Sequence, residues 1–244
     1  MPRQSQHTAK HILQALHALG DPKRAKTSQS FFKTGPGEYS EGDLFLGIRV
    51  PDLRALAKRY TELPLDQIIT LLRSKPHEAR LIALLMLVNR FRHADTTMQQ
   101  EIYSIYLANT DKINNWVLVD LSAEHIVGAW LSSRSKKPIY TLTRSTSLWE
   151  RRIAILSTFH DIKKGDPTET LTVAKLLLHD SHDLIHKAVG WMLREVGKRS
   201  SLEQEKSFLR AHAATMPRTM LRYAIEKFPE SERRRWLHET KIPS

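Results

Sequence analysis

One short pattern constrains the fold of this chain more than any other feature: a cation followed three residues later by a small residue, inside segments whose apolar residues fall three or four positions apart. It occurs at 80–83, 151–154 and 187–190, and in an imperfect form at 221–224. The small residues of successive copies lie 71, 36 and 34 positions apart. Since 71 is about twice 35, a further copy is expected near residue 119.

A period near 35 residues is typical of paired helices that stack as HEAT-like repeats into a curved superhelix. Segments such as HEARLIALLMLVNRF have helical periodicity, and only 9 Gly and 11 Pro interrupt the chain. Apolar alternation is scarce; its best candidate is DLFLGI, at 43–48. We therefore predict an all-α fold: a single domain at 1–244, a curved α-solenoid with a concave basic groove and at most one small β-hairpin. The alternative is a chance alignment of helices in an ordinary bundle.

The charge of the chain favours a polyanionic partner. It carries 38 Lys and Arg against 26 Asp and Glu, a formal net charge of +12, which gives a broad positive potential. Double-stranded DNA is the first partner to consider, and a basic surface that only maintains solubility is the alternative. The absence of cysteine excludes thiolate chemistry and fits a reducing compartment. With no signal-peptide-like or membrane-spanning apolar run, we expect a cytoplasmic, nucleoid-associated monomer without membrane contact.

The segment INNWVLVD, at 113–120, holds the most informative pair of side chains. If it is helical, Trp116 and Asp120 lie one turn apart on the same face. The repeat alignment places Trp116 at the position of the cations Arg80, Arg151 and Lys187, and Trp191 at the position of Asp120. Equivalent positions of a solenoid point the same way, so these side chains are expected to converge on one groove. The alternatives are a core Trp and a solvated ion-pair Asp.

Two indoles around a carboxylate suit a cationic group, because the faces of Trp rings and a desolvated carboxylate both attract cations. In a basic groove, the matching substrate is DNA that carries a purine alkylated at N3 or N7. Such a base is already cationic and leaves readily, so one carboxylate that stabilises the oxocarbenium-like sugar and orients a water is sufficient. The histidines at 179–186 are interpreted as capping or solvated residues, and we expect no metal and no cofactor.

Several segments together resemble the AlkD family of HEAT-like-repeat DNA alkylation repair proteins: GPGEYSEGDLFLGIRVPDLRALAKRY, INNWVLVD, LWERRIAI, LIHKAVGWMLREVGK and MPRTMLRYAIEKF. The resemblance implies excision of cationic bases such as 3-methyladenine and 7-methylguanine without base flipping. It assigns the catalytic role to Asp120, the cleft tryptophans to Trp116 and Trp191, and a DNA-backbone contact to Arg152. Further cations expected to contact DNA are Arg49, Arg80, Arg151 and Lys187.

One residue departs from the family pattern. Val117 stands where related sequences usually carry Asp, and it lies about 100° around the helix from Trp116. We therefore expect the change to affect packing or ion pairing before it affects the cleft. Two other functions remain open: a non-catalytic binder of damaged or branched DNA, and a protein-binding solenoid whose weak affinity for DNA is erased by modest salt.

Overall fold

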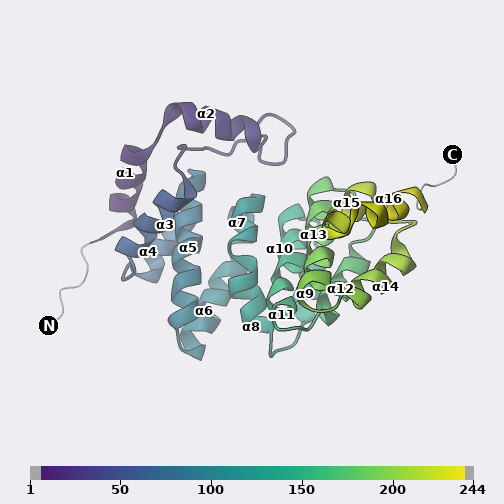
Figure 1. The fold of residues 1–244 in the computed structure, drawn as a ribbon. Coiled ribbons are helices and arrows are strands. Elements are labelled where there is room, and N and C mark those ends of the chain that lie inside the picture. Colours follow the sequence, from purple (N-terminus) through teal and green to yellow (C-terminus); the bar gives the residue numbers. More distant parts are fainter. Residues whose placement is uncertain (1–6, 240–244) are drawn as a thin grey trace. The chain divides into compact units, whose positions relative to one another are not determined.

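The computed structural model describes residues 7–239 and is all-α over that range, which confirms the predicted fold class. The chain divides into two compact units, unit 1 at residues 1–122 and unit 2 at 123–244 (Figure 1). The single domain at 1–244 stays a prediction, and the ends at 1–6 and 240–244 lie outside the described residues. Segment 43–48 forms no strand, and Leu44 makes one isolated parallel bridge to Pro76. None of the described helices is both long and apolar enough to span a membrane.

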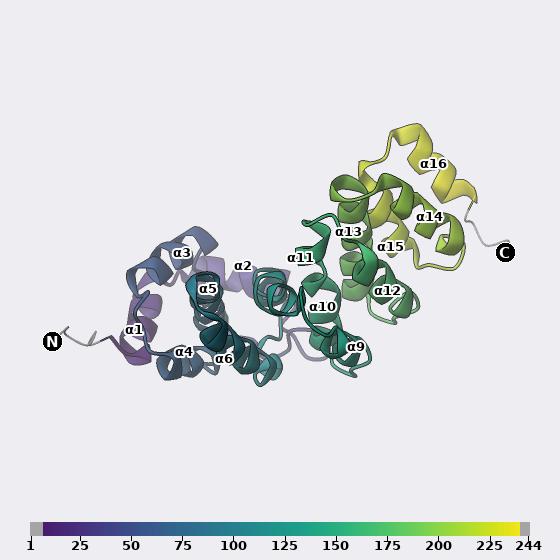
Figure 2. The same ribbon diagram turned by 90° about the horizontal axis from the view of Figure 1, so that it is seen from below.

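Unit 1 is built around one long buried helix. Its elements are α1 (Ala9–Leu19), α2 (Pro22–Phe31), α3 (Val50–Arg59), α4 (Leu65–Leu72), α5 (His77–His93), α6 (Thr96–Leu107), η1 (Thr110–Lys112) and α7 (Trp116–Asp120). Helix α5 is buried on nearly every face in its first three turns, where His77, Glu78 and Arg80 are buried together with the apolar residues. It packs against α3, α4, α6 and α7, and it lies between α3 and α4 in Figure 2. The core of unit 1 therefore supports the short helix that carries Trp116 and Asp120.

Unit 2 has a second long helix at its centre. Its elements are η2 (Glu124–Gly128), α8 (Ala129–Leu131), α9 (Lys137–Thr143), α10 (Leu148–Ser157), α11 (Phe159–Ile162), α12 (Thr168–Leu176), α13 (Asp183–Arg199), α14 (Leu202–His212), α15 (Arg218–Ala224), η3 (Ile225–Lys227) and α16 (Glu230–Glu239). Helix α13 packs against α10, α12, α14 and α15. Its Gly190 explains one small residue of the repeat pattern, because a Cβ there would lie 2.3 Å from the carbonyl oxygen of Met220.

The repeat pattern has a structural counterpart in two arginines. Arg80 donates hydrogen bonds to the backbone carbonyls six and five residues before it, and to the carboxylate of Asp43. Arg151 donates to the carbonyls at the same two offsets, and to the carboxylate of Asp180. Each is the fourth residue of its helix. Both arginines therefore fix the loop that leads into their helix to an acid elsewhere in the same unit.

Two other members of the alignment, Trp116 and Lys187, do not take the fourth position of their helices. Trp116 is the first residue of α7 rather than the fourth, so it does not correspond to Arg80 by helix position. In α13 the fourth residue is His186, whose Nε2 lies 2.5 Å from the carbonyl oxygen six residues before it. Lys187 instead pairs with Asp183 at 2.7 Å. The pattern of a cation three residues before a small residue is thus offset by one residue at Lys187 and by three at Trp116.

Candidate functional site

Helix α7 is held at both ends, which fixes the pair that it presents. Asn115 accepts a hydrogen bond from the backbone N–H of Val117 and donates one to Ser40 at 3.0 Å. After the helix, Ser122 donates to the carbonyl of Leu118 at 2.5 Å and lies 2.9 Å from the hydroxyl of Tyr106. The last five residues of INNWVLVD form the helix, so Trp116 and Asp120 lie at i and i+4 on it, as expected if the segment is helical.

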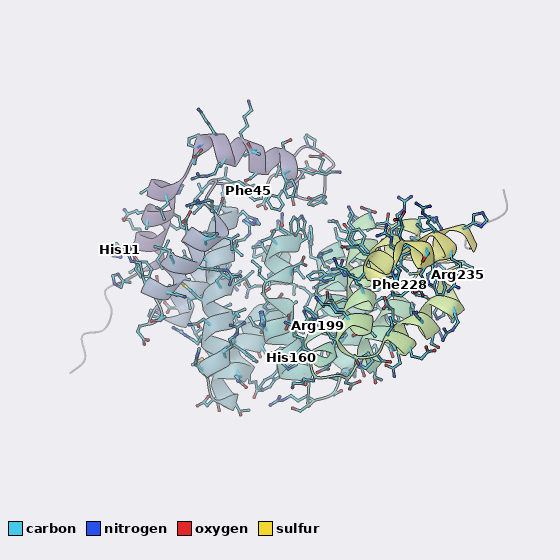
Figure 3. All side chains as sticks on the ribbon, in the orientation of Figure 1. His11, Phe45, His160, Arg199, Phe228 and Arg235 are labelled. Carbon is cyan, nitrogen blue, oxygen red and sulfur yellow. The ribbon has the colours of Figure 1, made fainter. Side chains whose placement is uncertain are left out.

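The surroundings of Trp116 are aromatic. Its ring centroid lies 5.2 Å from that of Phe32 and 6.1 Å from that of Phe31, both from the end of α2. Phe32 stacks on Phe45 at 4.8 Å, and Phe45 stacks on His77 at 4.4 Å. Phe45 lies on the side of α2 that faces the rest of unit 1 (Figure 3). Phe31 remains 64% exposed, so the cluster ends in an aromatic side chain that is open to solvent beside Trp116.

A buried polar triad lies under this cluster. Asp43 contacts Nδ1 of His77 at 3.3 Å with one carboxylate oxygen and accepts from Arg80 with the other. Burial alone would raise the pKa of Asp43, but the hydrogen bond with His77 and the charge of Arg80 bring that pKa below its usual value. Arg80, which fixes the loop before α5, is thus linked through the carboxylate of Asp43 to His77. His77 in turn stacks on the phenyl rings of the cluster around Trp116.

The charge of Asp120 is felt by a buried tyrosine of unit 1. Burial raises the pKa of Tyr106 well above its usual value, the hydrogen bond with Ser122 opposes that rise, and the negative charge of Asp120 adds to it. Asp120 itself is half-buried. A half-buried carboxylate beside an indole is able to stabilise a cation that approaches from solvent.

In unit 2, Trp191 is oriented by a directional contact. Its indole N–H donates to Glu195 at 3.3 Å, one turn later on α13. Glu195 is buried and accepts from Arg199 at 2.5 Å. On another side Trp191 meets Phe159 with ring centroids 6.0 Å apart, and Lys163 lies 4.3 Å from the centroid of that phenyl ring. A buried acid and a phenyl ring therefore both constrain the indole.

Exposure separates the two candidate tryptophans from the others. Trp130, Trp149 and Trp236 are at most 9% exposed and belong to the core. Trp116 and Trp191 are half-buried, so each keeps indole surface accessible. That difference favours the functional interpretation of these two residues over the core alternative.

The predicted cations fall into two groups. Arg80 is only 4% exposed, and Arg152 is buried and donates to the carbonyl of Leu184 at 2.6 Å. Arg49 and Lys187 are paired within their own helix regions, Arg49 with Asp52 at 2.9 Å. The hydrogen bond with Asp52 raises the pKa of Arg49. The enclosure of Arg80 and Arg152 favours a structural role for both, whereas Arg49 and Lys187 keep accessible side chains.

The predicted site residues belong to both units. Trp116, Asp120, Arg49 and Arg80 are in unit 1, and Trp191, Arg152, Arg151 and Lys187 are in unit 2. Their convergence on one groove stays a prediction. A cleft of about 390 Å³ in unit 1 is lined by Arg73, Lys75, Lys112 and Asn114 among others, and by neither Trp116 nor Asp120.

Three residues next to the tryptophans were not found from the sequence. Phe31 and Phe32 form an adjacent aromatic pair at the end of a basic, polar segment. Two aromatic residues in such a segment are the sequence feature that could have indicated their role. Glu195 follows Trp191 at the same i, i+4 spacing that drew attention to Asp120. His182, by contrast, confirms the capping interpretation, since it accepts a hydrogen bond from the N–H of Leu184 at the start of α13.

Comparison with known proteins places this architecture. The family model described as DNA alkylation repair enzyme matches residues 12–228. The chain belongs to the DNA alkylation repair enzyme family. Among solved structures it is similar to a predicted DNA alkylation repair enzyme from Enterococcus faecalis, with a TM-score of 0.67 and 17% sequence identity over 86% of this chain and 97% of that chain. A search of curated proteins found no significant match.

Membership of the DNA alkylation repair enzyme family gives the site residues a context. The match covers α7, α10 and α13, so it includes both accessible tryptophans and Asp120. A role in the repair of alkylated DNA follows from the family, and with it DNA as the partner.

Proposed function

We propose that this member of the DNA alkylation repair enzyme family is a glycosylase that excises N3- and N7-alkylated purines from duplex DNA without flipping the base. The observation that carries the proposal is the placement of Trp116 and Asp120 one turn apart on α7, both half-buried, within the family match.

In the proposed reaction the C1′–N bond of the cationic purine breaks, and its electron pair leaves with the base, which becomes neutral. The positive charge passes to the sugar, where the carboxylate of Asp120 stabilises it and orients the attacking water; the water oxygen bonds to C1′ and the water releases one proton to solvent. The indoles of Trp116 and Trp191 contribute cation–π and sugar contacts worth about 1–2 kcal/mol when desolvated. Arg49 and Lys187, the predicted cations whose side chains stay accessible, contact the DNA backbone. The reaction uses no metal or cofactor, and the protein acts as a cytoplasmic, nucleoid-associated monomer.

The test is single-turnover release of base from a duplex that contains 7-methylguanine. Asp120→Asn keeps the shape of the side chain and removes its charge, so release should fall by about 10² or more, a cost of roughly 3 kcal/mol in the transition state. Affinity for the same duplex should stay similar or rise. Asp111→Asn is the matched control, because Asp111 is an exposed acid of the same unit that pairs with Lys112.

Each remaining outcome selects another function. An Asp120→Asn protein that folds and releases base at the wild-type rate removes the catalytic assignment. A wild-type protein that retains alkylated DNA without releasing base is a non-catalytic binder. Weak DNA affinity that modest salt erases points to a protein-binding scaffold.

A further inference from the structure

Helix α2 is unusual in unit 1 because it buries no residue at all. Its sequence, PKRAKTSQSF, holds one alanine and one phenylalanine as its only apolar side chains other than the first proline. Polar helices of this length are marginal in water, so tertiary contacts must hold it. Its position on the surface therefore needs specific anchors.

The anchors lie at its two ends. At the start, Asp21 caps the helix through the backbone N–H groups of Lys23 and Arg24, and Arg24 Nε donates to the carbonyl of Gly47 at 2.8 Å. Gly47 has a φ of 79°, and a Cβ there would lie 2.4 Å from the carbonyl oxygen of Asp21. At the other end, Phe32 stacks on Phe45. Contacts at its two ends, rather than a buried apolar face, therefore hold the helix in place.

The two sides of α2 differ in exposure. Ala25, Ser28, Gln29 and Phe32 are half-buried and share one face by their helical spacing. The opposite stripe is exposed and consists of Lys23, Lys26, Thr27 and Ser30. No acidic residue occurs inside the helix. The outward stripe therefore presents only cations and hydroxyl groups, the side chains that contact the phosphate and sugar of DNA.

The stripe also lies next to a candidate site residue. Phe31, which follows Ser30 at the end of α2, is 64% exposed and contacts the ring of Trp116. A DNA strand that contacts Trp116 in the proposed reaction would pass the end of α2. A helix face that served only to contact solvent would need neither specific anchors at both ends of α2 nor the absence of acidic residues.

We propose that the outward stripe of α2 (Lys23, Lys26, Thr27 and Ser30) is a binding surface for the phosphate backbone of double-stranded DNA, beside Trp116. This inference rests on the proposed function for its partner. It adds a sequence-independent clamp in unit 1, in which Lys23 and Lys26 each neutralise one phosphate.

The experiment compares Lys23→Ala/Lys26→Ala with wild type in binding an undamaged duplex over a series of salt concentrations. The plot of log K against log salt should become shallower by about 1.8, since each neutralised phosphate contributes about 0.9 to the slope. Arg54→Ala/Lys58→Ala on α3 is the control, because it removes the same charge from two exposed positions of the same unit. Far-UV circular dichroism checks that all three proteins fold alike.

Equal changes of slope in the two double variants would show that only the net charge of the protein matters, and would overturn the proposal. An unchanged slope for the α2 variant would overturn it as well. The measurement uses undamaged DNA, so it is separate from the chemistry. If the α2 variant shows the shallower slope while wild-type protein releases no base, only the glycosylase proposal is removed. Wild-type protein that releases base while the α2 variant binds like wild type removes only the clamp.

Discussion

The two units hold their accessible tryptophans in different ways. In unit 1, Trp116 lies against Phe31 and Phe32, so its orientation depends on the shape of a ring cluster. In unit 2, Trp191 donates its indole hydrogen to the buried Glu195. Ring packing is non-directional and fails when volume is lost, whereas a hydrogen bond fails when a single atom is lost. The same residue type therefore has different points of weakness in the two units.

The largest difference should come from the two loop-fixing arginines. Arg80→Met leaves the buried Asp43 without its charged partner, and breaking a buried pair in this way costs about 3–5 kcal/mol of unfolding free energy. Arg151→Met should cost less, because the side chain of Arg151 is 15% exposed and Asp180 also accepts from the N–H of His182. Chemical denaturation of both variants measures the difference. Equal losses would show that the two contacts are energetically equivalent.

The Arg80 variant also tests the link to Trp116. Asp43 joins Arg80 to His77, which stacks on the ring that supports Phe32. Near-UV circular dichroism should therefore change in Arg80→Met and stay close to wild type in Arg151→Met. A spectrum unchanged by Arg80→Met would separate the triad from the aromatic cluster.

The units should also respond to pH in opposite directions. The pKa of Asp43 in unit 1 is lowered, so its stabilising effect is present above the unfolded value of 3.8 and is lost as pH falls through the folded value. In unit 2, burial raises the pKa of Glu205 to about 8, and Oε1 of this residue has no hydrogen-bond partner among the described residues. Its contribution is complete below pH 4.5 and is lost as pH rises toward 8.

Glu205→Gln should accordingly stabilise the protein at pH 8 by roughly 2–4 kcal/mol and change little near pH 4.5. Melting temperatures measured across that range give the result. A gain of the same size at every pH would mean that Glu205 is not protonated in the folded protein at neutral pH. Asp43→Asn serves as the comparison from unit 1 and should destabilise most at neutral pH.

The smallest effect concerns the indole hydrogen. Trp116→Phe keeps an aromatic ring in the cluster and should leave stability nearly unchanged, whereas Trp191→Phe removes the donor to Glu195 and should cost about 1 kcal/mol. Thermal unfolding of the two variants provides the measurement. A loss of several kcal/mol from Trp116→Phe would restore the core interpretation of Trp116.

The sequence predicted local features better than long-range ones. Helical periodicity gave the all-α fold, and the small residues Ala83 and Ala154 are fully buried in the helices that the pattern predicts. The i, i+4 relation of Trp116 and Asp120 was also correct, because it depends only on one turn of helix. These features follow from spacing within one element.

Features that depend on distant partners could not be predicted from one sequence. The burial of Arg80 depends on Asp43, which lies 37 residues away, and that of Arg151 depends on Asp180, 29 residues away. No local pattern shows that a cation will turn inward to an acid on another element. For the same reason the sequence predicts a groove position for Arg80 and Arg151, and the structure shows both guanidinium groups bonded within their own units.

The lack of buried residues in α2 has a consequence for how this protein can change over evolutionary time. A substitution in a packed helix alters binding and stability together, whereas one in the outward stripe of α2 leaves the core untouched. Selection can therefore adjust the charge of this surface gradually while the fold stays constant. The lifetime of the complex between the protein and undamaged DNA would change with that charge. Protein engineers have the same freedom, since residues 23, 26, 27 and 30 can be randomised together without a compensating change elsewhere.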